Sequence, residues 1–412
     1  MPSDPPHRLS THTVHADRRL GDAHGGVHFP IHPSTQFSFD RTDDLIAVFQ
    51  GRRKSASYGR QGTPTTSALE SKLASLDEGV GAITFATGMA AISALFLTLL
   101  RAGDHLIISR HVFGNTLSLI ETLEHLGIAV SRIDTREVGQ VEATLRPTTR
   151  MVFVEAVANP GTQIPDLESI GALLRDRGIL YVVDNTILSP ALFRAASVGA
   201  DLIIHSLSKS MAGHGQAMGG VLIDTGRFDW TAYPNISASY RSVDPAQQGL
   251  TQVRKKGLRD MGARLSSQEA HAISVGLETL SLRMRQVSDS ALAIARFLST
   301  HPAVARVAYP MLESHPQHER ARRLFRGGSW LIAVELRDAS RSIAIIDRLH
   351  CFLKATGLGD ARSLVIPMAQ TIFWEAGPDK RREYDIADGL IRLSIGLEDT
   401  DDLIADLAAA LA

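Results

Sequence analysis

The sequence has few of the features that mark disulfide-bonded, membrane-spanning or secreted proteins. A single cysteine among 412 residues excludes a disulfide within the chain and suits a reducing compartment. The longest apolar run, near Ala90–Leu100, is interrupted by Ser93 and Thr98 and is too short to cross a bilayer. The first residues, Met1 to Pro6, have no apolar core of the signal-peptide kind. We therefore expect a soluble, cytoplasmic protein.

An excess of one charge is also missing. The 43 basic and 44 acidic side chains nearly cancel, and no block of like charge stands out. The sequence thus indicates neither nucleic acid nor a membrane as partner. The lone Cys351 lies in an apolar stretch typical of a small buried hydrophobe rather than a nucleophile. Five N-terminal histidines follow no ordered ligand spacing, so we predict no metal site: they are His12, His15, His24, His28 and His32.

The order of apolar segments predicts an α/β architecture. Between residues 81 and 223, short strands rich in Val, Ile and Leu alternate with helical patterns. This alternation favours a mostly parallel sheet with helices on both faces. The predicted strands are Ala82–Phe85, His105–Ser109, Ala129–Ile133, Met151–Glu155, Leu180–Asp184, Asp201–His205 and Gly220–Ile223.

The regions on either side of this sheet differ from it in pattern. Residues 1–62 lack clear periodicity and are too many for an idle tail, so we predict an arm that packs on another part, such as a neighbouring subunit. Residues 63–262 form the predicted large domain. Residues 263–412 form a smaller α+β domain, which opens with one long helix from Ser266 to about His301 and ends with a helix over Thr400–Leu411.

Residues just after the strands carry the candidate chemistry, because ligands of such sheets lie outside the carboxyl ends of the strands. Gly88 stands between a strand and a helix, where it serves either packing or the binding of an anion by free helix amides. Asp184 ends an apolar strand, either as a helix cap or as the partner of a protonated ring nitrogen. No dinucleotide or P-loop glycine pattern is present, which argues against an NAD-dependent or ATP-dependent enzyme.

Lys209 has the context of a Schiff-base amine. It follows a buried strand by a few residues, and partial desolvation there lowers an amine pKa. Ser206 and Ser208 can donate to phosphate oxygens, and Phe113, after another strand, either joins the core or stacks on a planar cofactor. Together with Gly88 and Asp184, these residues are what pyridoxal 5′-phosphate (PLP) requires.

Longer motifs resemble those of the cystathionine γ-synthase, cystathionine lyase and methionine γ-lyase family, the Cys/Met-metabolism group of fold-type I PLP enzymes. The likeness covers nearly the whole chain. The matching segments are residues 13–16, 30–31, 58–65, 86–91, 155–160, 183–186, 205–209, 213–215, 357–359 and 391–396. The resemblance implies the fold-type I transferase fold and a homotetramer, a dimer of dimers with active sites shared between subunits.

The resemblance also implies a role for each matching residue. Lys209 would form the Schiff base and act in catalysis with Phe113 and Tyr58, and Asp184 would contact the pyridine nitrogen. Gly88, Met89, Ser206 and Ser208 would hold the phosphate, with Tyr58 and Arg60 reaching the phosphate of a neighbouring subunit. Asn159 would lie near the phenolic oxygen of the cofactor. Arg392 would hold the substrate carboxylate, with Gly357 beside it.

Several positions depart from the family pattern. Phe113 stands where most members have Tyr, and in having Phe at this position the chain resembles the O-succinylhomoserine sulfhydrylase branch. Gly357 stands where most members have Ser. Gln216 replaces an Asp, and Ile366 replaces the His of a His-Pro pair. The cofactor residues are thus kept, whereas the substrate side is atypical.

Two reactions remain open. An ester leaves as a carboxylate with a conjugate-acid pKa of about 4, against about 8.5 for a thiol, and so needs less acid assistance. Because Phe113 lacks a hydroxyl, we favour γ-replacement on O-succinyl- or O-acetylhomoserine by a thiol such as cysteine or sulfide. The alternative is a γ- or β-lyase acting on cystathionine, methionine or another γ-substituted amino acid such as canavanine. A PLP fold with a purely binding role is the non-enzymatic rival.

Overall fold

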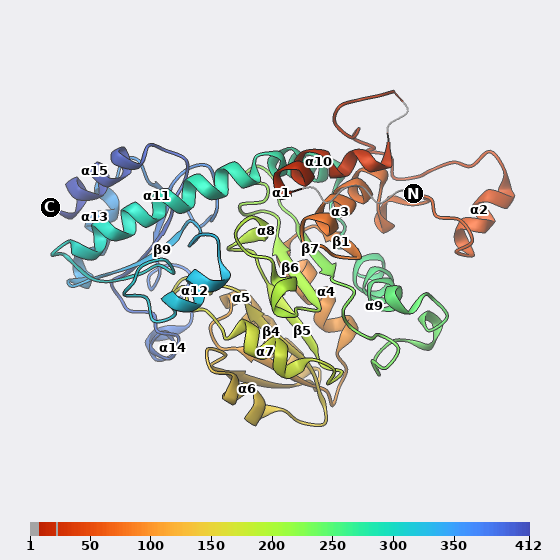
Figure 1. Cartoon of the computed structure of the whole chain (residues 1–412), viewed down its shortest axis with the longest axis horizontal. Helices are drawn as coiled ribbons and strands as arrows, with labels where there is room; N and C mark the ends of the chain where they lie inside the picture. The colour runs from red at the N-terminus through yellow and green to blue at the C-terminus, as the bar shows by residue number, and fades with distance from the viewer. Residues whose placement is uncertain (1–7, 22–23) are drawn as a thin grey trace.

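A seven-stranded sheet forms the centre of the molecule (Figure 1). The computed structural model describes residues 8–21 and 24–412. The strand order is β1-β7-β6-β5-β4-β2-β3, and only β7 runs antiparallel to its neighbours. The strands are β1 (Gly81–Phe85), β2 (His105–Ser109), β3 (Ala129–Ile133), β4 (Thr149–Glu155), β5 (Leu180–Asp184), β6 (Leu202–Ser206) and β7 (Gly220–Asp224). The predicted, mostly parallel sheet is confirmed.

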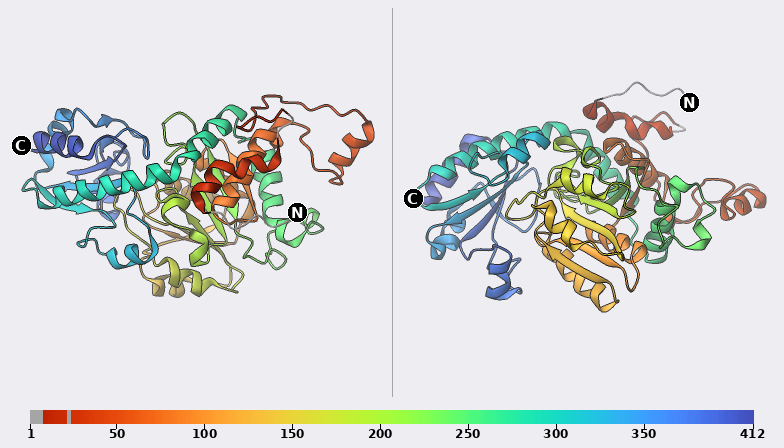
Figure 2. Two further views of the ribbon diagram at one scale, coloured as in Figure 1. Left: turned by 45° about the horizontal axis from the view of Figure 1, so that its top comes forward. Right: turned by 60° about the horizontal axis from the view of Figure 1, so that its bottom comes forward.

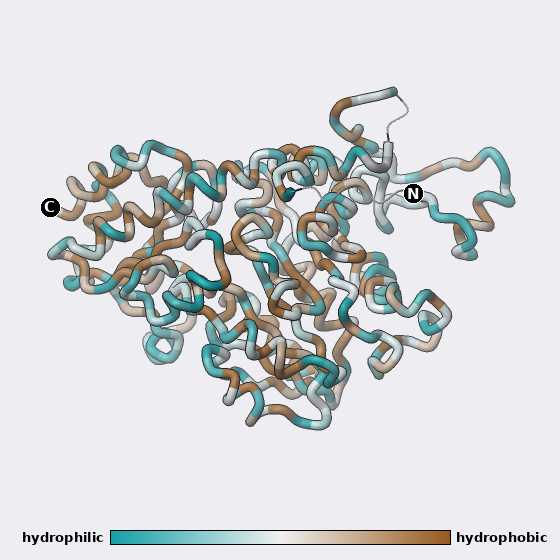
Figure 3. The backbone as a smooth tube through the Cα atoms, in the orientation of Figure 1, coloured by the Kyte–Doolittle hydropathy of each residue, from teal (hydrophilic) through white to brown (hydrophobic). Residues whose placement is uncertain are grey.

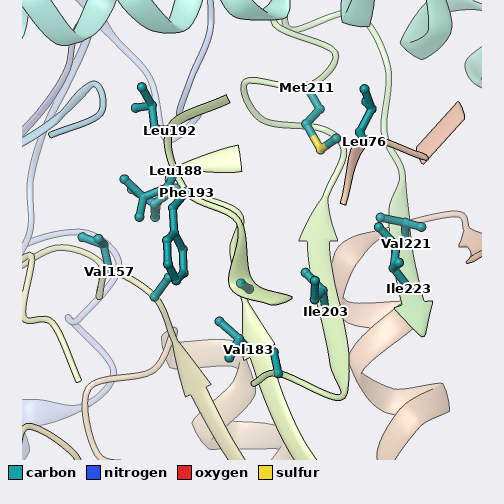
Figure 4. Close-up of a cluster of buried hydrophobic side chains, with 14 of the residues drawn as sticks. Leu76, Val157, Val183, Leu188, Leu192, Phe193, Ile203, Met211, Val221 and Ile223 are labelled. Carbon is teal, nitrogen blue, oxygen red and sulfur yellow. The ribbon is translucent and has the colours of Figure 1, made fainter. Parts of the chain in front are cut away.

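Both faces of this sheet are buried, because neighbouring residues of each strand join different cores. Val183 and Ile203 join one core, whereas Val182 and Ile204 join the other. Figure 4 shows Val183 and Ile203 in the first core, with Phe193 nearby. The helices of the first core include α3 (Pro64–Leu76), α7 (Leu167–Leu174), α8 (Ser189–Leu192) and α10 (Ser267–Glu278). Those of the second include α4 (Gly88–Leu99), α5 (Gly114–His125) and α9 (Gln248–Gln252).

A second, five-stranded sheet builds the C-terminal part, in the order β10-β11-β12-β9-β8. Its strands are β8 (Val304–Ala308), β9 (Leu331–Leu336), β10 (Leu353–Lys354), β11 (Leu364–Pro367) and β12 (Leu390–Ser394). The remaining helices are α6 (Val138–Thr144), α11 (Leu280–Thr300), α12 (His318–Leu324), α13 (Ser342–Arg348), α14 (Gly377–Glu383) and α15 (Thr400–Leu411). The helix α11 runs from the large sheet to this one (Figure 1). Figure 3 shows hydrophobic segments gathered along the strands and hydrophilic ones at the outer loops.

The long helix predicted from Ser266 is wrong, because it is two helices. Thr279, with φ −102° and ψ 6°, lies between α10 and α11 outside helical geometry. Arg283 spans the break, donating to Thr279 Oγ1 at 3.0 Å and to the carbonyl of Gly276 at 2.6 Å. Near the end of α10, a Cβ on Gly276 would lie 2.2 Å from the Ala212 carbonyl oxygen, so glycine permits the close approach of α10 to the large domain. Hydrophobic periodicity does not reveal a one-residue interruption such as that at Thr279.

The N-terminal region packs partly on its own chain. The short helix α1 (Leu9–His15) contacts α3 and α10, and Asp17 pairs with the fully buried Lys72 at 2.9 Å. Farther along, α2 (Thr42–Phe49) has no buried residue and stands clear of the rest in all three views (Figures 1 and 2). The contact of this arm with a neighbouring subunit stays a prediction, as do the three domain boundaries.

Three further observations concern membrane spans, metal clusters and Cys351. Within the described ranges, no helix is long and apolar enough to span a membrane. No group of three or more His, Cys, Asp or Glu in that part of the chain is placed to hold a metal ion. Cys351 is half-buried against the C-terminal core, and burial raises the pKa of its thiol.

Candidate active site

A cavity of about 820 Å³ lies at the carboxyl ends of the parallel strands. This volume is in the range of small-molecule sites. The C-terminal domain closes one side, through β12 and the segments 356–358 and 370–375. The structure brings together nine of the predicted site residues as lining of the cavity: Gly88, Met89, Phe113, Asn159, Asp184, Ser206, Ser208, Lys209 and Arg392.

Lys209 extends into this cavity from the turn after β6, where its backbone N–H donates to the Ser206 carbonyl at 3.2 Å. Burial lowers the pKa of the Lys209 amine, and the nearby positive charge of Arg392 lowers it further. Both effects favour the uncharged, nucleophilic form of the amine.

Asp184 lies at the end of β5 with one oxygen already occupied. Its Oδ1 accepts from the Thr186 backbone N–H at 2.9 Å and from Thr186 Oγ1 at 2.5 Å. Burial raises the pKa of Asp184, although the bonds from Thr186 oppose the shift. No described residue donates to its Oδ2, so a cationic N–H group in the cavity would find an acceptor there and would favour the ionised carboxylate.

The start of α4 lies beside Ser206 at one corner of the cavity. Thr87 caps the helix by accepting from the Ala90 N–H at 3.0 Å, and Gly88 is its first residue. A Cβ on Gly88 would lie 2.8 Å from Cβ of Ser206, so only glycine lets the helix start come this close to Ser206. Ser208 Oγ accepts from the Gly219 N–H at 3.0 Å. Free amides and serine hydroxyls at a helix start fit a phosphate group.

Arg392 presents a buried positive charge without a carboxylate partner among the described residues. Only 2% of it is exposed, and burial lowers the pKa of its guanidinium to about 10. The group donates to Asn159 Oδ1 at 3.2 Å and to the carbonyls of Thr356 at 2.9 Å and Gly357 at 3.3 Å. Buried charges are normally paired, so this group suits a ligand carboxylate. Gly357 itself does not line the cavity, whereas its neighbours do.

Phe113 and Glu155 are linked at the wall of the cavity. Phe113 precedes the first residue of α5, and its backbone N–H donates to Glu155 Oε1 at 2.6 Å. Burial raises the pKa of Glu155 well above its usual range, and the charge of Asp184 raises it further. Glu155 was not among the site residues predicted from the sequence. Its position at the end of a buried strand, like that of Asp184, is the sequence signal that could have identified Glu155 as a site residue.

Tyr58 and Arg60 lie outside the cavity of their own chain. Arg60 donates to the Arg259 carbonyl at 2.7 Å, and its guanidinium lies 5.5 Å from the centre of the Tyr58 ring. Tyr58 is 44% exposed. Their predicted contact with the phosphate of a neighbouring subunit remains a prediction.

Other lining residues were not predicted to form the site. They are Thr87, Ile92, Asn115, Thr116, Glu155, Val157, Thr186, Ile187, Met218, Thr356, Leu358, Gln370, Thr371, Ile372, Trp374 and Glu375. Although Ile366, a few residues earlier, departs from the family pattern, no role was predicted from the sequence for the segment 370–375. Its place on the cavity wall depends on how the C-terminal domain docks.

Comparison with known proteins decides the family. The sequence model of the Cys/Met metabolism PLP-dependent enzymes matches residues 10–412. The chain belongs to this family. It is therefore a PLP-dependent enzyme of the cystathionine γ-synthase and lyase type, which acts on small molecules and has the fold-type I architecture. The resemblance drawn from the motifs is confirmed.

Relatives in the family carry out different reactions. The chain is 33% identical to an L-methionine gamma-lyase of Pseudomonas deceptionensis, over 98% of this chain and 97% of that protein. It is 34% identical to a cystathionine gamma-synthase of Mycobacterium bovis, over 98% of this chain and 96% of that protein. It is 32% identical to an O-acetyl-L-homoserine sulfhydrylase of Corynebacterium glutamicum, over 98% and 97%. Such similar identities do not select one reaction.

Solved structures agree with the fold. A Campylobacter jejuni chain described as an O-acetylhomoserine (thiol)-lyase, which carries a pyridoxyl-lysine phosphate, superposes with a TM-score of 0.94 at 32% identity. The match covers 98% of this chain and 100% of that one. A cystathionine gamma synthase of Xanthomonas oryzae superposes with a TM-score of 0.88 at 31% identity, covering 99% and 98%.

The cavity of this chain fits PLP. It combines an amine of lowered pKa on Lys209, a carboxylate oxygen of Asp184 without a donor among the described residues, and a helix start at Gly88 that approaches Ser206 closely. We propose that Lys209 would hold the cofactor, Asp184 would contact its ring nitrogen and Phe113 would stack on the ring. The phosphate would lie at Gly88, Met89, Ser206 and Ser208.

Proposed function

We propose that the enzyme catalyses γ-replacement on an O-acylhomoserine, in which a thiol such as cysteine or sulfide takes the place of the acyl group. The site would then serve sulfur amino-acid metabolism of the transsulfuration or methionine type. The proposal depends on how the leaving group departs from the γ-carbon.

The absence of tyrosine from the described lining of the cavity supports this proposal. Phe113 occupies the position beside the proposed ring site, and no tyrosine is among the described residues of one chain that line the cavity. The Tyr58 that a neighbouring subunit would contribute is proposed at the phosphate, not beside the leaving group. A carboxylate leaving group, with a conjugate-acid pKa of about 4, departs without a strong acid, whereas a thiolate, at about 8.5, requires more help. The site therefore suits an ester better than a thioether.

Residues of the chain would transfer protons and hold the substrate. Bound PLP withdraws electrons from the substrate α-carbon and so acidifies the protons there and at the β-carbon. The amine of Lys209 takes the Cα proton, gives it up, and then takes a Cβ proton, because one amine holds only one abstracted proton at a time. Cβ and Cα are protonated again once the new substituent is attached. Arg392 holds the α-carboxylate by two parallel hydrogen bonds, with Asn159 and the Gly357 carbonyl keeping its guanidinium in place.

A γ- or β-lyase is the second candidate, supported by the likeness to methionine gamma-lyase at 33% identity. In that reaction no thiol is captured, and the product hydrolyses to ammonia and a 2-oxoacid. A substrate panel on the PLP-loaded enzyme separates the two. O-Acetylhomoserine, O-succinylhomoserine, cystathionine, methionine and canavanine are each supplied with and without cysteine or sulfide, and products are read by mass spectrometry.

We expect a new thioether only when an acyl-homoserine and a thiol acceptor are both present. Ammonia and 2-oxobutanoate from a thioether alone would establish the lyase and defeat the leaving-group argument.

We also propose that the enzyme is a cytoplasmic homotetramer, a dimer of dimers in which Tyr58 and Arg60 complete a neighbouring active site. The exposed helix α2 and the half-exposed Tyr58 ring support this arrangement.

A further inference from the structure

The segment that follows β11 places two unusual side chains on the cavity wall. Phe373 is buried in a small core with Met368, and its N–H donates to the Met368 carbonyl at 3.1 Å. The Trp374 N–H donates to the Thr371 carbonyl at 3.0 Å, which closes a tight turn. Trp374 and Glu375 then line the cavity, yet Trp374 is 68% exposed and Glu375 is exposed too. An indole held at the mouth of a site by a buried neighbour is available to a ligand.

Glu375 has no ion pair or hydrogen bond to any described residue, although basic side chains follow it closely. Each of those is engaged elsewhere. Lys380 pairs with Glu121, Arg381 with Asp388 and Arg382 with Asp379. The carboxylate at the cavity mouth is thus left without a cation from the described part of its own chain.

Beyond the groups proposed for the phosphate and the α-carboxylate, the described lining of the cavity in one chain offers no further cation for an anionic group. Lys209 and Arg392 are the only cationic side chains among its described lining residues. The proposed function uses both, Lys209 for the cofactor and proton transfer and Arg392 for the α-carboxylate. A substrate whose far end is negatively charged would therefore meet Glu375 and no free cation among the described residues that line the cavity.

We propose that Trp374 and Glu375 form a subsite for the positively charged end of the substituent on the substrate γ-carbon, whether that substituent is entering or leaving. This inference rests on the proposed function for the placement of the α-carboxylate at Arg392. An ammonium or guanidinium group is attracted by the face of an indole and forms charge-assisted hydrogen bonds with a carboxylate. The subsite selects amino-thiol acceptors over anionic thiols, and donors whose acyl group has no carboxylate.

Binding of two nearly isosteric ligands tests the subsite without turnover. L-Arginine and L-citrulline differ only in the charged or neutral end group, and each is titrated into the PLP-loaded enzyme by calorimetry. We expect the wild-type enzyme to bind arginine about threefold to tenfold more tightly, as an exposed ion pair with an aromatic face would give. Glu375→Gln should remove the preference, and Trp374→Leu should reduce it.

Glu383→Gln is the matched control. Glu383 is an exposed carboxylate at the end of α14 that does not line the cavity. This variant should retain the wild-type preference. Equal binding of arginine and citrulline, failure of arginine to bind, or a preference that survives Glu375→Gln would overturn the proposal.

A turnover experiment separates this inference from the proposed function. O-Acetylhomoserine is supplied with cysteamine or with 2-mercaptoethanol, a cationic and a neutral acceptor of similar size, and kcat/KM is compared. The subsite predicts a cysteamine preference that Glu375→Gln abolishes. Conversion of both acceptors at equal rates would overturn the subsite but leave γ-replacement standing. If neither of these acceptors is converted, and cysteine and sulfide are not converted either, γ-replacement is wrong, and the arginine and citrulline titration still decides the subsite.

Discussion

Glu155 and Asp184 are register partners at the carboxyl ends of the adjacent parallel strands β4 and β5. Both carboxyl groups face the same buried cavity, and the charge of Asp184 adds to burial in raising the pKa of Glu155. Two acids in one desolvated site do not both ionise readily. Burial raises the pKa of Asp184 as well, but two hydrogen bonds from Thr186 oppose that rise. We infer that Glu155 is the more readily protonated of the two acids and that it holds the Phe113 backbone.

This pairing predicts different outcomes for two variants of Glu155. Glu155→Gln keeps a neutral acceptor for the Phe113 N–H, so PLP affinity should change by less than about threefold. Glu155→Ala leaves that partly buried N–H without its acceptor, at a cost of about 1–3 kcal/mol, and frees the Phe113 ring. PLP titration and urea unfolding measure the two effects. Equal damage from both variants would show that the charge of Glu155, rather than its hydrogen bond, matters.

Replacement of Lys209 should remove catalysis without removing the fold. We expect Lys209→Ala to lower kcat by at least about 10²–10⁴-fold, the usual contribution of a positioned acid–base group. Its far-ultraviolet circular dichroism should match that of the wild type, since the Lys209 amine makes no hydrogen bond that holds the described structure together. Initial rates on the best substrate of the panel provide the measurement. Substantial remaining activity would exclude Lys209 from its proposed role.

A hydroxyl added to the Phe113 ring should change the choice of leaving group. Phe113→Tyr supplies a proton donor near the reacting atoms, and a thiolate benefits from it more than a carboxylate. We therefore expect elimination from cystathionine or methionine to rise relative to reaction of O-acetylhomoserine, by about tenfold or more. The ratio of kcat/KM values is the measurement, and an unchanged ratio would refute the leaving-group argument.

Substitution of Arg392 should act mainly on substrate binding. Arg392→Lys keeps the positive charge but loses the fork that matches a carboxylate, and a charged hydrogen bond contributes about 1.5–3 kcal/mol. We expect KM for the amino-acid substrate to rise by about 10–100-fold. PLP affinity, measured separately, should change little. An unaltered KM would mean that the α-carboxylate binds elsewhere.

Asp201 lies directly before β6, and its shifted pKa predicts that the stability of the fold depends on pH. Burial raises its pKa from 3.8 to about 7, although its bond from the Tyr181 N–H at 2.8 Å opposes the shift. Between these values the folded chain binds more protons than the unfolded chain, so this residue lowers stability as the pH rises from about 4 to about 7.

Asp201→Asn should remove this contribution, on the order of 1–3 kcal/mol, while keeping an acceptor for Tyr181. Thermal midpoints measured at about pH 5 and about pH 8 provide the comparison. The thermal midpoint of the variant, relative to that of the wild type, should be higher at about pH 8 than at about pH 5. A difference that does not depend on pH would contradict the shifted pKa of Asp201.

The sequence alone determined the large sheet and most of the cofactor residues. All seven predicted strands exist, because each strand is a short run of apolar β-formers between turn residues. Gly88, Asp184 and Lys209 were found because parallel strands bring their carboxyl ends to one edge. The roles assigned to these residues remain proposals, but their convergence follows from local patterns and one rule of topology.

Only the tertiary structure decided how the C-terminal domain completes the site. The strand ends of the large sheet share the lining of the cavity with Arg392 on β12 and with Trp374 and Glu375 in the segment after β11. These residues lie about 165–210 positions beyond Asp184 and Lys209, and no local periodicity encodes such a contact. The pairing of Glu155 with Asp184 likewise depends on strand register. Local sequence thus determined the elements, whereas docking and register determined which charges meet.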